Sequence, residues 1–287
     1  MIAVFQREFK SYFNNMIGYV IVAAWCFFIG YSYCVYNVIY GYPYFGISLA
    51  GTVVYLLILT PILTMKSFSE ERKTKTDQLL LTAPVSVTQV VLGKFLAMAA
   101  VFAIPMLISC IYPILLQQQT YNSLAIDAAS MVAFFLLGCA YISIGMFISP
   151  LTESQIISAV ISFAVFYLMS AMENITSNIS DTTYVNAIGF CVIALAIALL
   201  VYFVTKNLYA SIITLLCLVI AIWAVYFIDN TVYAGLLATV LNTISLYNGI
   251  SYFANGIINV QDIVLFLSVI VVFVFLTVQS VQKRRWN

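Results

Sequence analysis

Residues 66–94 read KSFSEERKTKTDQLLLTAPVSVTQVVLGK and contain eight of the 21 charged residues in this chain of 287. The stretches on either side, 11–65 and 95–126, contain no charged residue. A helix needs about 20 mainly apolar residues to cross the hydrocarbon core of a bilayer, and both stretches exceed that length. The sequence therefore predicts a polar loop between membrane-spanning helices.

The composition supports a membrane protein and excludes several other classes. Apolar residues make up 64% of the chain and charged residues only 7%, which is too little polar surface for a water-soluble enzyme. A net charge of +1, with no basic run longer than three residues, excludes a nucleic-acid binder. Histidine is absent and the six cysteines occur singly. We therefore expect no catalytic residue, no metal site and no disulfide.

The charge-free stretches predict an all-α polytopic protein that forms a single transmembrane domain over residues 1–287. The first stretch is too long for one helix and divides at 41–46 (GYPYFG), a turn sequence with interfacial aromatic residues. The stretch 230–261 is rich in asparagine and glycine and is not counted as a full span. Eight spans are expected, at about 17–40, 47–66, 90–116, 127–149, 154–171, 186–204, 208–228 and 263–282.

Lysine and arginine fix the orientation. If both termini are cytoplasmic, all 11 basic residues fall in or beside the inside segments, and the outside loops hold none. This distribution follows the positive-inside rule. Removing one span would place the basic cluster 283–285 outside, so the rule also supports the span count.

The segment 1–16 has apolar and polar residues on opposite helical faces. The apolar positions are Ile2, Phe5, Phe9, Tyr12, Phe13 and Met16. This pattern favours an amphipathic helix in the inner membrane interface. The alternative is that the segment simply begins the first span.

The loop 67–89 shows helix signals at both ends. Ser67 and Glu70 have the spacing of a capping box, which predicts that 70–73 (EERK) extends the second span as a helix. Ser86 and Gln89 repeat this spacing at the start of the third span. Lys94 is long enough for its ammonium group to reach back to the interface.

A short helix is expected in the middle of the loop, from Gln78 to Leu81. Thr76 or Asp77 can cap it, and Pro84 ends it because the residue before proline is disfavoured in the α region. Three consecutive leucines, Leu79, Leu80 and Leu81, lie on this helix. They indicate a groove on another subunit or contact with the membrane surface. The alternative is a solvated charge run whose leucines dip into lipid.

Residues 70–86, followed by Leu92-Gly93-Lys94, resemble the cytoplasmic loop of ABC-2-type transporter permeases. The resemblance is closest to the gliding-motility and nitrous-oxide-maturation branch. Supporting segments are 145–149 with 151–155, 255–259 and 283–286. The resemblance covers most of the chain apart from about 172–228.

This resemblance implies a bacterial inner-membrane permease whose coupling helix docks on a cytosolic ABC ATPase subunit, two copies per complex. The chain has no G-x-x-x-x-G-K-[ST] motif, so ATP is expected in that partner and the chain is not expected to be an enzyme. A second permease, identical or related, completes the pathway, and export is the expected direction. The residues expected to couple to the ATPase are Glu70, Glu71, Arg72, Lys73, Thr76, Asp77, Gln78, Leu79, Leu80, Leu81, Thr82 and Glu153.

The sequence departs from the family in its number of spans, because typical members have six. Residues 186–228 look like an inserted hairpin of two spans, and 229–262 like the family's external helical segment. Two other functions stay open. One is a scaffold that passes ATPase motion to an extracytoplasmic or lipid-anchored partner without transport. The other is a membrane enzyme, which the absence of histidine and of paired intramembrane carboxylates disfavours.

Overall fold

The computed structural model describes all residues except 76–85, 118–123, 179–181, 206–207, 229–234, 245, 247–252, 254–256, 258 and 286–287. Within the described part, the regular structure is entirely helical, so the predicted all-α polytopic fold is confirmed. The chain groups into two units, one made of Met1–Leu168 with Tyr247–Asn287 and the other of Met169–Leu246.

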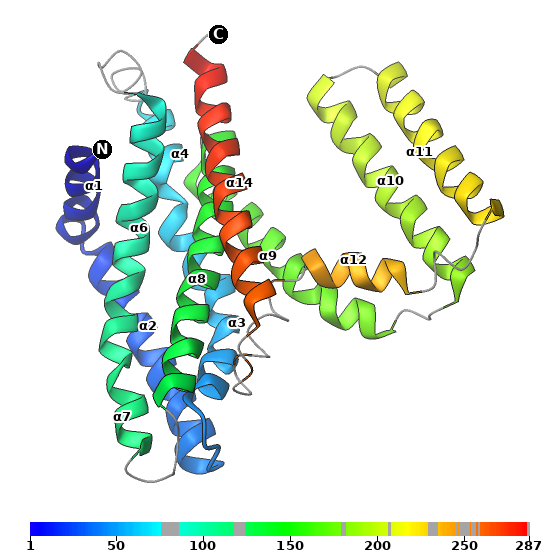
Figure 1. Ribbon diagram of the computed structural model, residues 1–287. Helices are drawn as coiled ribbons and strands as arrows, with labels where there is room; N and C mark the ends of the chain where they lie inside the picture. The colour runs from blue at the N-terminus through cyan, green and yellow to red at the C-terminus, as the bar shows by residue number, and fades with distance from the viewer. Residues whose placement is uncertain are drawn as a thin grey trace. The chain divides into compact units, whose positions relative to one another are not determined.

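The first unit is a bundle of long helices (Figure 1). Its elements are α1 (Ile2–Asn14), α2 (Ile17–Tyr33), the π-helix η1 (Cys34–Ile39), α3 (Phe45–Thr64), α4 (Lys66–Lys73), α6 (Val87–Ser109), α7 (Ile111–Gln117), α8 (Leu124–Ile148), the 3₁₀ turn η2 (Ser149–Leu151) and α14 (Val260–Arg285). Helix α9 (Gln155–Asn178) begins in this unit. α8 packs against α3, α6 and α14, which makes it the central helix of the bundle.

Aromatic side chains fill the core between α2, α6 and α8. The Trp25 ring meets Phe102 and Phe134 at centroid distances of 5.2 and 6.2 Å. All three side chains are at most 1% exposed. Gly138 faces Phe102 so closely that a Cβ atom there would overlap the ring. Small residues allow helices to approach in this way inside a membrane bundle.

The amphipathic segment at the N-terminus forms the expected helix, α1. It ends at Asn14, and Met16, which adopts a left-handed conformation (φ 58°), separates α1 from α2. α1 packs on α6 (Figure 1), and the Tyr12 hydroxyl donates a hydrogen bond to the Leu63 carbonyl oxygen at 3.1 Å. Its position in the inner membrane interface stays a prediction.

The second unit contains α10 (Thr183–Thr205), α11 (Leu208–Ile228) and α12 (Leu236–Ile244). α10 and α11 pack as the predicted hairpin, and the Ser211 hydroxyl donates to the Ala198 carbonyl oxygen at 2.7 Å. α12 lies within the predicted external segment. Its Leu237 side chain is buried against Gly189 of α10.

Every predicted span falls on a helix. Among the described residues, six helical segments are long and apolar enough to cross a membrane: Ile17–Ile39, Phe45–Lys73, Val87–Leu116, Leu124–Leu151, Gln155–Met172 and Val260–Lys283. α10 and α11 contain shorter apolar segments, Thr183–Leu195 and Ser211–Phe227, by the same measure. That these two helices also cross the membrane stays a prediction.

Candidate coupling site

The charged run after the second span is helical, as predicted, but it begins differently. α3 breaks at Met65, and α4 continues to Lys73. The expected capping role of Ser67 is wrong, because Ser67 lies inside the first turn of α4 and its Oγ has no hydrogen-bond partner. The helix is already under way at this position, so a cap cannot form there.

A hydroxyl from another segment caps α4 instead. The backbone N–H groups of Phe68 and Ser69 both donate to the Ser149 Oγ atom at 3.1 Å, and Ser149 donates to the Met65 carbonyl oxygen at 3.2 Å. The first N–H groups of a helix have no partner within the helix and need one from outside. Ser149, in the turn after α8, therefore satisfies the backbone on both sides of the α3–α4 break.

The end of α3 also approaches α8 very closely. Gly145 lies against Thr64, and a Cβ atom at Gly145 would overlap the Thr64 Oγ1 atom. Thr64 is fully buried, and its hydroxyl is 3.0 Å from the Thr60 carbonyl oxygen. The α3–α4 break is thus held against α8 by both a hydrogen-bonded cap and direct packing.

Lys94 is the centre of an ion-pair cluster on the other side of α4. Its Nζ atom lies 2.8 Å from Glu71 Oε1, 3.4 Å from Glu8 Oε2 and 2.6 Å from the Ser67 carbonyl oxygen. The Lys94 side chain is only 3% exposed within the protein, and that its ammonium group reaches the membrane interface stays a prediction. Two carboxylates and a carbonyl surround the ammonium group, and such partners are what permit a charge to be buried.

Arg7 completes this cluster from α1. Its Nη2 atom lies 2.6 Å from Glu8 Oε1 and 3.4 Å from Glu71 Oε1. The hydrogen bond to Glu8 raises the pKa of the arginine. Burial raises the pKa of the Tyr12 phenol, so the phenol stays neutral. Because Arg7 and Glu8 belong to α1, Glu71 to α4 and Lys94 to α6, the cluster joins these three helices.

A second ion pair links α4 to the next turn. Arg72 Nη2 lies 2.9 Å from Glu153 Oε1, and Arg72 Nη1 donates to the Pro150 carbonyl oxygen at 3.2 Å. The structure thus brings Glu153 to the root of the loop. The Glu153 side chain is 70% exposed, so this pair adds little stability by itself.

We call Glu71, Arg72, Lys94, Ser149 and Glu153 the α4 anchor. The structure brings three of the predicted coupling residues, Glu71, Arg72 and Glu153, into it. Glu70 and Lys73 lie on the exposed side of α4. The remaining predicted residues, Thr76, Asp77, Gln78, Leu79, Leu80, Leu81 and Thr82, lie outside the described residues.

Sequence reasoning missed Glu8, Lys94 and Ser149 as members of one site. Glu8 lies on the polar face that the sequence predicts for the segment 1–16, and Lys94 lies in the first turns of the predicted span 90–116. A usable signal was the position of Lys94 two turns inside α6, where a lysine needs a partner. In contrast, the predicted cap at Ser86 is confirmed, because its side chain accepts from the Gln89 N–H at 3.3 Å.

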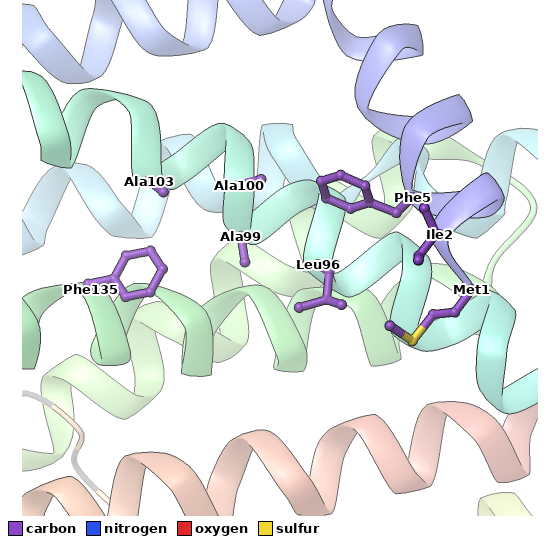
Figure 2. A pocket seen from close by; sticks show the side chains of 8 residues that line it. All are labelled: Met1, Ile2, Phe5, Leu96, Ala99, Ala100, Ala103 and Phe135. Atoms are coloured by element: carbon purple, nitrogen blue, oxygen red, sulfur yellow. The ribbon is translucent and has the colours of Figure 1, made fainter.

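A shallow apolar cavity of about 390 Å³ lies beside the cluster, between α1, α6 and α8 (Figure 2). It is lined by Met1, Ile2, Phe5, Leu96, Ala99, Ala100, Ala103 and Phe135. These side chains offer no acid, base or nucleophile. Among the described residues, no three cysteine, aspartate or glutamate side chains are grouped as a metal site would require.

The comparisons with known proteins agree with this architecture. The family model described as ABC-2 family transporter protein matches residues 19–210, from within α2 to the start of α11. The match includes α10, the first helix of the predicted inserted hairpin. Neither the curated proteins nor the solved structures gave a significant match. A match over well over half of the chain, on a bundle of membrane-spanning helices, shows that this protein belongs to the ABC-2 family and is a membrane permease component of an ABC transporter.

Proposed function

We propose that this chain is the permease subunit of an ABC exporter of the bacterial inner membrane, and that a separate cytosolic ATPase docks on the loop 67–89. The observation that carries the proposal is the α4 anchor. α4 continues α3 in sequence, is capped by Ser149 after α8, and is paired with Lys94 of α6. A force applied to the loop would therefore act on three membrane helices at once.

In this mechanism, two ATPase subunits close when they bind ATP and displace the segment Gln78 to Thr82. α4 transmits the displacement to α3, α6 and α8 through the α4 anchor. Glu153 offers a second contact for the ATPase, because it is exposed beside Arg72. By thermodynamic linkage, a cargo that shifts the permease between its states also shifts nucleotide affinity.

Two such permeases, identical or related, would enclose one pathway, with both termini in the cytoplasm. The resemblance in the loop favours the gliding-motility and nitrous-oxide-maturation branch. Export is the direction implied by that resemblance.

The test is co-purification of the ATPase from the native membrane in mild detergent. We expect the double variant Leu79→Asp and Leu80→Asp to insert normally but to lose the ATPase and its ATP hydrolysis. Leu208→Asp is the control, because it makes the same kind of change at the first residue of α11, where a helix N-terminus tolerates an acidic residue. Retention of the ATPase by the double variant would overturn the proposed docking site.

A further inference from the structure

Three tyrosine rings form a cluster at the turn between α2 and α3, on the opposite end of these helices from the α4 anchor. The ring centroids of Tyr36 and Tyr40 are 6.4 Å apart, those of Tyr36 and Tyr42 are 6.4 Å apart, and those of Tyr40 and Tyr42 are 6.3 Å apart. The rings thus stand at the corners of a nearly equilateral triangle. Their planes are inclined to one another by 41° to 59°, so the rings are splayed rather than stacked. We call these three residues the tyrosine cup.

The backbone that carries the tyrosine cup is fixed by its own hydrogen bonds. Asn37 is 5% exposed, and its Nδ2 group donates to the carbonyl oxygens of Tyr42 at 2.8 Å and Tyr44 at 3.0 Å. The Tyr42 N–H donates to the Tyr36 carbonyl oxygen at 3.1 Å. Gly41 adopts the positive φ of 70° that this tight reversal requires. The cup is therefore held in place before any ligand arrives.

One ring of the tyrosine cup packs against α3, and the other two are exposed. The Tyr36 ring lies so close to Gly51 of α3 that a Cβ atom at position 51 would overlap it. Tyr40 and Tyr42 are 68% and 46% exposed. Tyr36 is thus fixed against α3, and the other two rings are accessible from outside the protein.

The dimensions of the cup suit a cation. The centre of the triangle formed by the three ring centroids lies about 3.7 Å from each centroid. A cation placed about 3 Å above the plane of this triangle, over its centre, is roughly 5 Å from every ring centroid. This is inside the limit of about 6 Å for a cation–π interaction. Grouped aromatic rings of this kind recognise quaternary ammonium groups.

The local sequence leaves the cup available to an outside cation. Residues 11–65 contain no charged side chain, so neither α2 nor α3 supplies a lysine or arginine to fill it. The turn 40–44 lies between the candidate spans Ile17–Ile39 and Phe45–Lys73, which places it at the membrane surface. Lipid headgroups are at this depth.

We propose that the tyrosine cup binds the ammonium group of a zwitterionic lipid headgroup, such as choline. On the orientation proposed above, this lipid belongs to the outer leaflet. The leaflet rests on that proposed orientation, whereas the binding itself does not depend on ATPase docking.

The test measures lipid adducts of the full-length protein by native mass spectrometry, with phosphatidylcholine and phosphatidylglycerol of the same chain length. We expect Tyr40→Leu and Tyr42→Leu each to weaken phosphatidylcholine binding about fivefold and to leave phosphatidylglycerol binding unchanged. Tyr40→Phe keeps the aromatic face and should stay within about twofold of the wild type. Tyr31→Leu is the matched control, because Tyr31 is 53% exposed on α2 but is not part of the cup.

Tetramethylammonium chloride provides the free-cation arm of the test. It should displace phosphatidylcholine from the wild type and have no effect on Tyr40→Leu. Equal losses of both lipids in Tyr40→Leu, or an equal loss in Tyr31→Leu, would show ordinary aromatic contacts with the membrane surface and overturn the proposal. A Tyr40→Phe variant as weak as Tyr40→Leu would also overturn it. Binding of tetramethylammonium without any preference for phosphatidylcholine over phosphatidylglycerol would overturn the lipid as the source.

Discussion

Replacing Lys94 by methionine tests the most buried charge of the α4 anchor. Methionine keeps most of the length of the side chain, so the change removes the ammonium group with little loss of packing. The carboxylates of Glu8 and Glu71 then face each other at side-chain exposures of only 16% and 18%. The Ser67 carbonyl oxygen also loses its donor.

The expected cost follows from these surroundings. Removing one partner of a buried ion pair typically costs about 3–5 kcal/mol, because the other charge is left uncompensated. Arg7 still lies 2.6 Å from Glu8 and 3.4 Å from Glu71, although its side chain is 55% exposed and therefore screened. We therefore expect the free energy of unfolding to fall by about 3 kcal/mol, the lower end of that range.

The assay is unfolding in mixed micelles as the fraction of sodium dodecyl sulfate is raised, followed by tryptophan fluorescence. Trp25 is a suitable reporter, because it is 1% exposed in the core of the same bundle. Adding Glu71→Gln to Lys94→Met should recover at least about 1 kcal/mol, because it removes one of the two buried carboxylates that lost the Lys94 ammonium group. Lys10→Met, at an exposed position of α1, should change nothing. A single variant within about 0.5 kcal/mol of the wild type, or a double variant no more stable than the single, would refute the ion-pair argument.

Three further outcomes are expected. Ser149→Ala should destabilise the bundle by about 1–3 kcal/mol in the same assay, because two backbone N–H groups lose their acceptor; Ser149→Thr, which keeps the hydroxyl, should be milder, and equal losses would contradict the capping role. Gly145→Ala should cost about 1–3 kcal/mol through overlap with Thr64, and adding Thr64→Ala should restore part of it; no restoration would refute the packing argument. Glu153→Ala should cost less than about 1 kcal/mol in stability, because its pair with Arg72 is exposed, but it should lower ATPase activity in the assembled complex; wild-type activity would exclude Glu153 as an ATPase contact.

The sequence predicts the helices well because the signals for them are local. The gaps between charges give the lengths of the helices. Glycine and proline at 41–46 mark the turn, and Ser86 with Gln89 gives a helix start that the structure confirms. Each of these signals depends on residues within one or two turns of one another.

The α4 anchor depends on residues that are distant in the sequence, and the sequence alone does not pair them. Lys94 is buried because Glu8 and Glu71 surround it, and Glu8 is 86 positions away. Ser149 acts as a cap for a helix that begins more than 80 residues earlier. At Ser67 a local signal is misleading. Ser67 and Glu70 have the spacing of a capping box, but Ser67 lies inside a helix that has already begun.

The order of synthesis has a consequence for how Lys94 enters the membrane. Both of its carboxylate partners, Glu8 and Glu71, precede it in the chain and are made before it. The two glutamates can remain in contact with water until Lys94 is made. A lysine without a partner, two turns inside a newly made helix, opposes insertion of that helix into the membrane. The ammonium group therefore arrives last, at a place where opposite charge is already present. Insertion of α6 during synthesis would then depend on α1 and α4 being correctly placed beforehand.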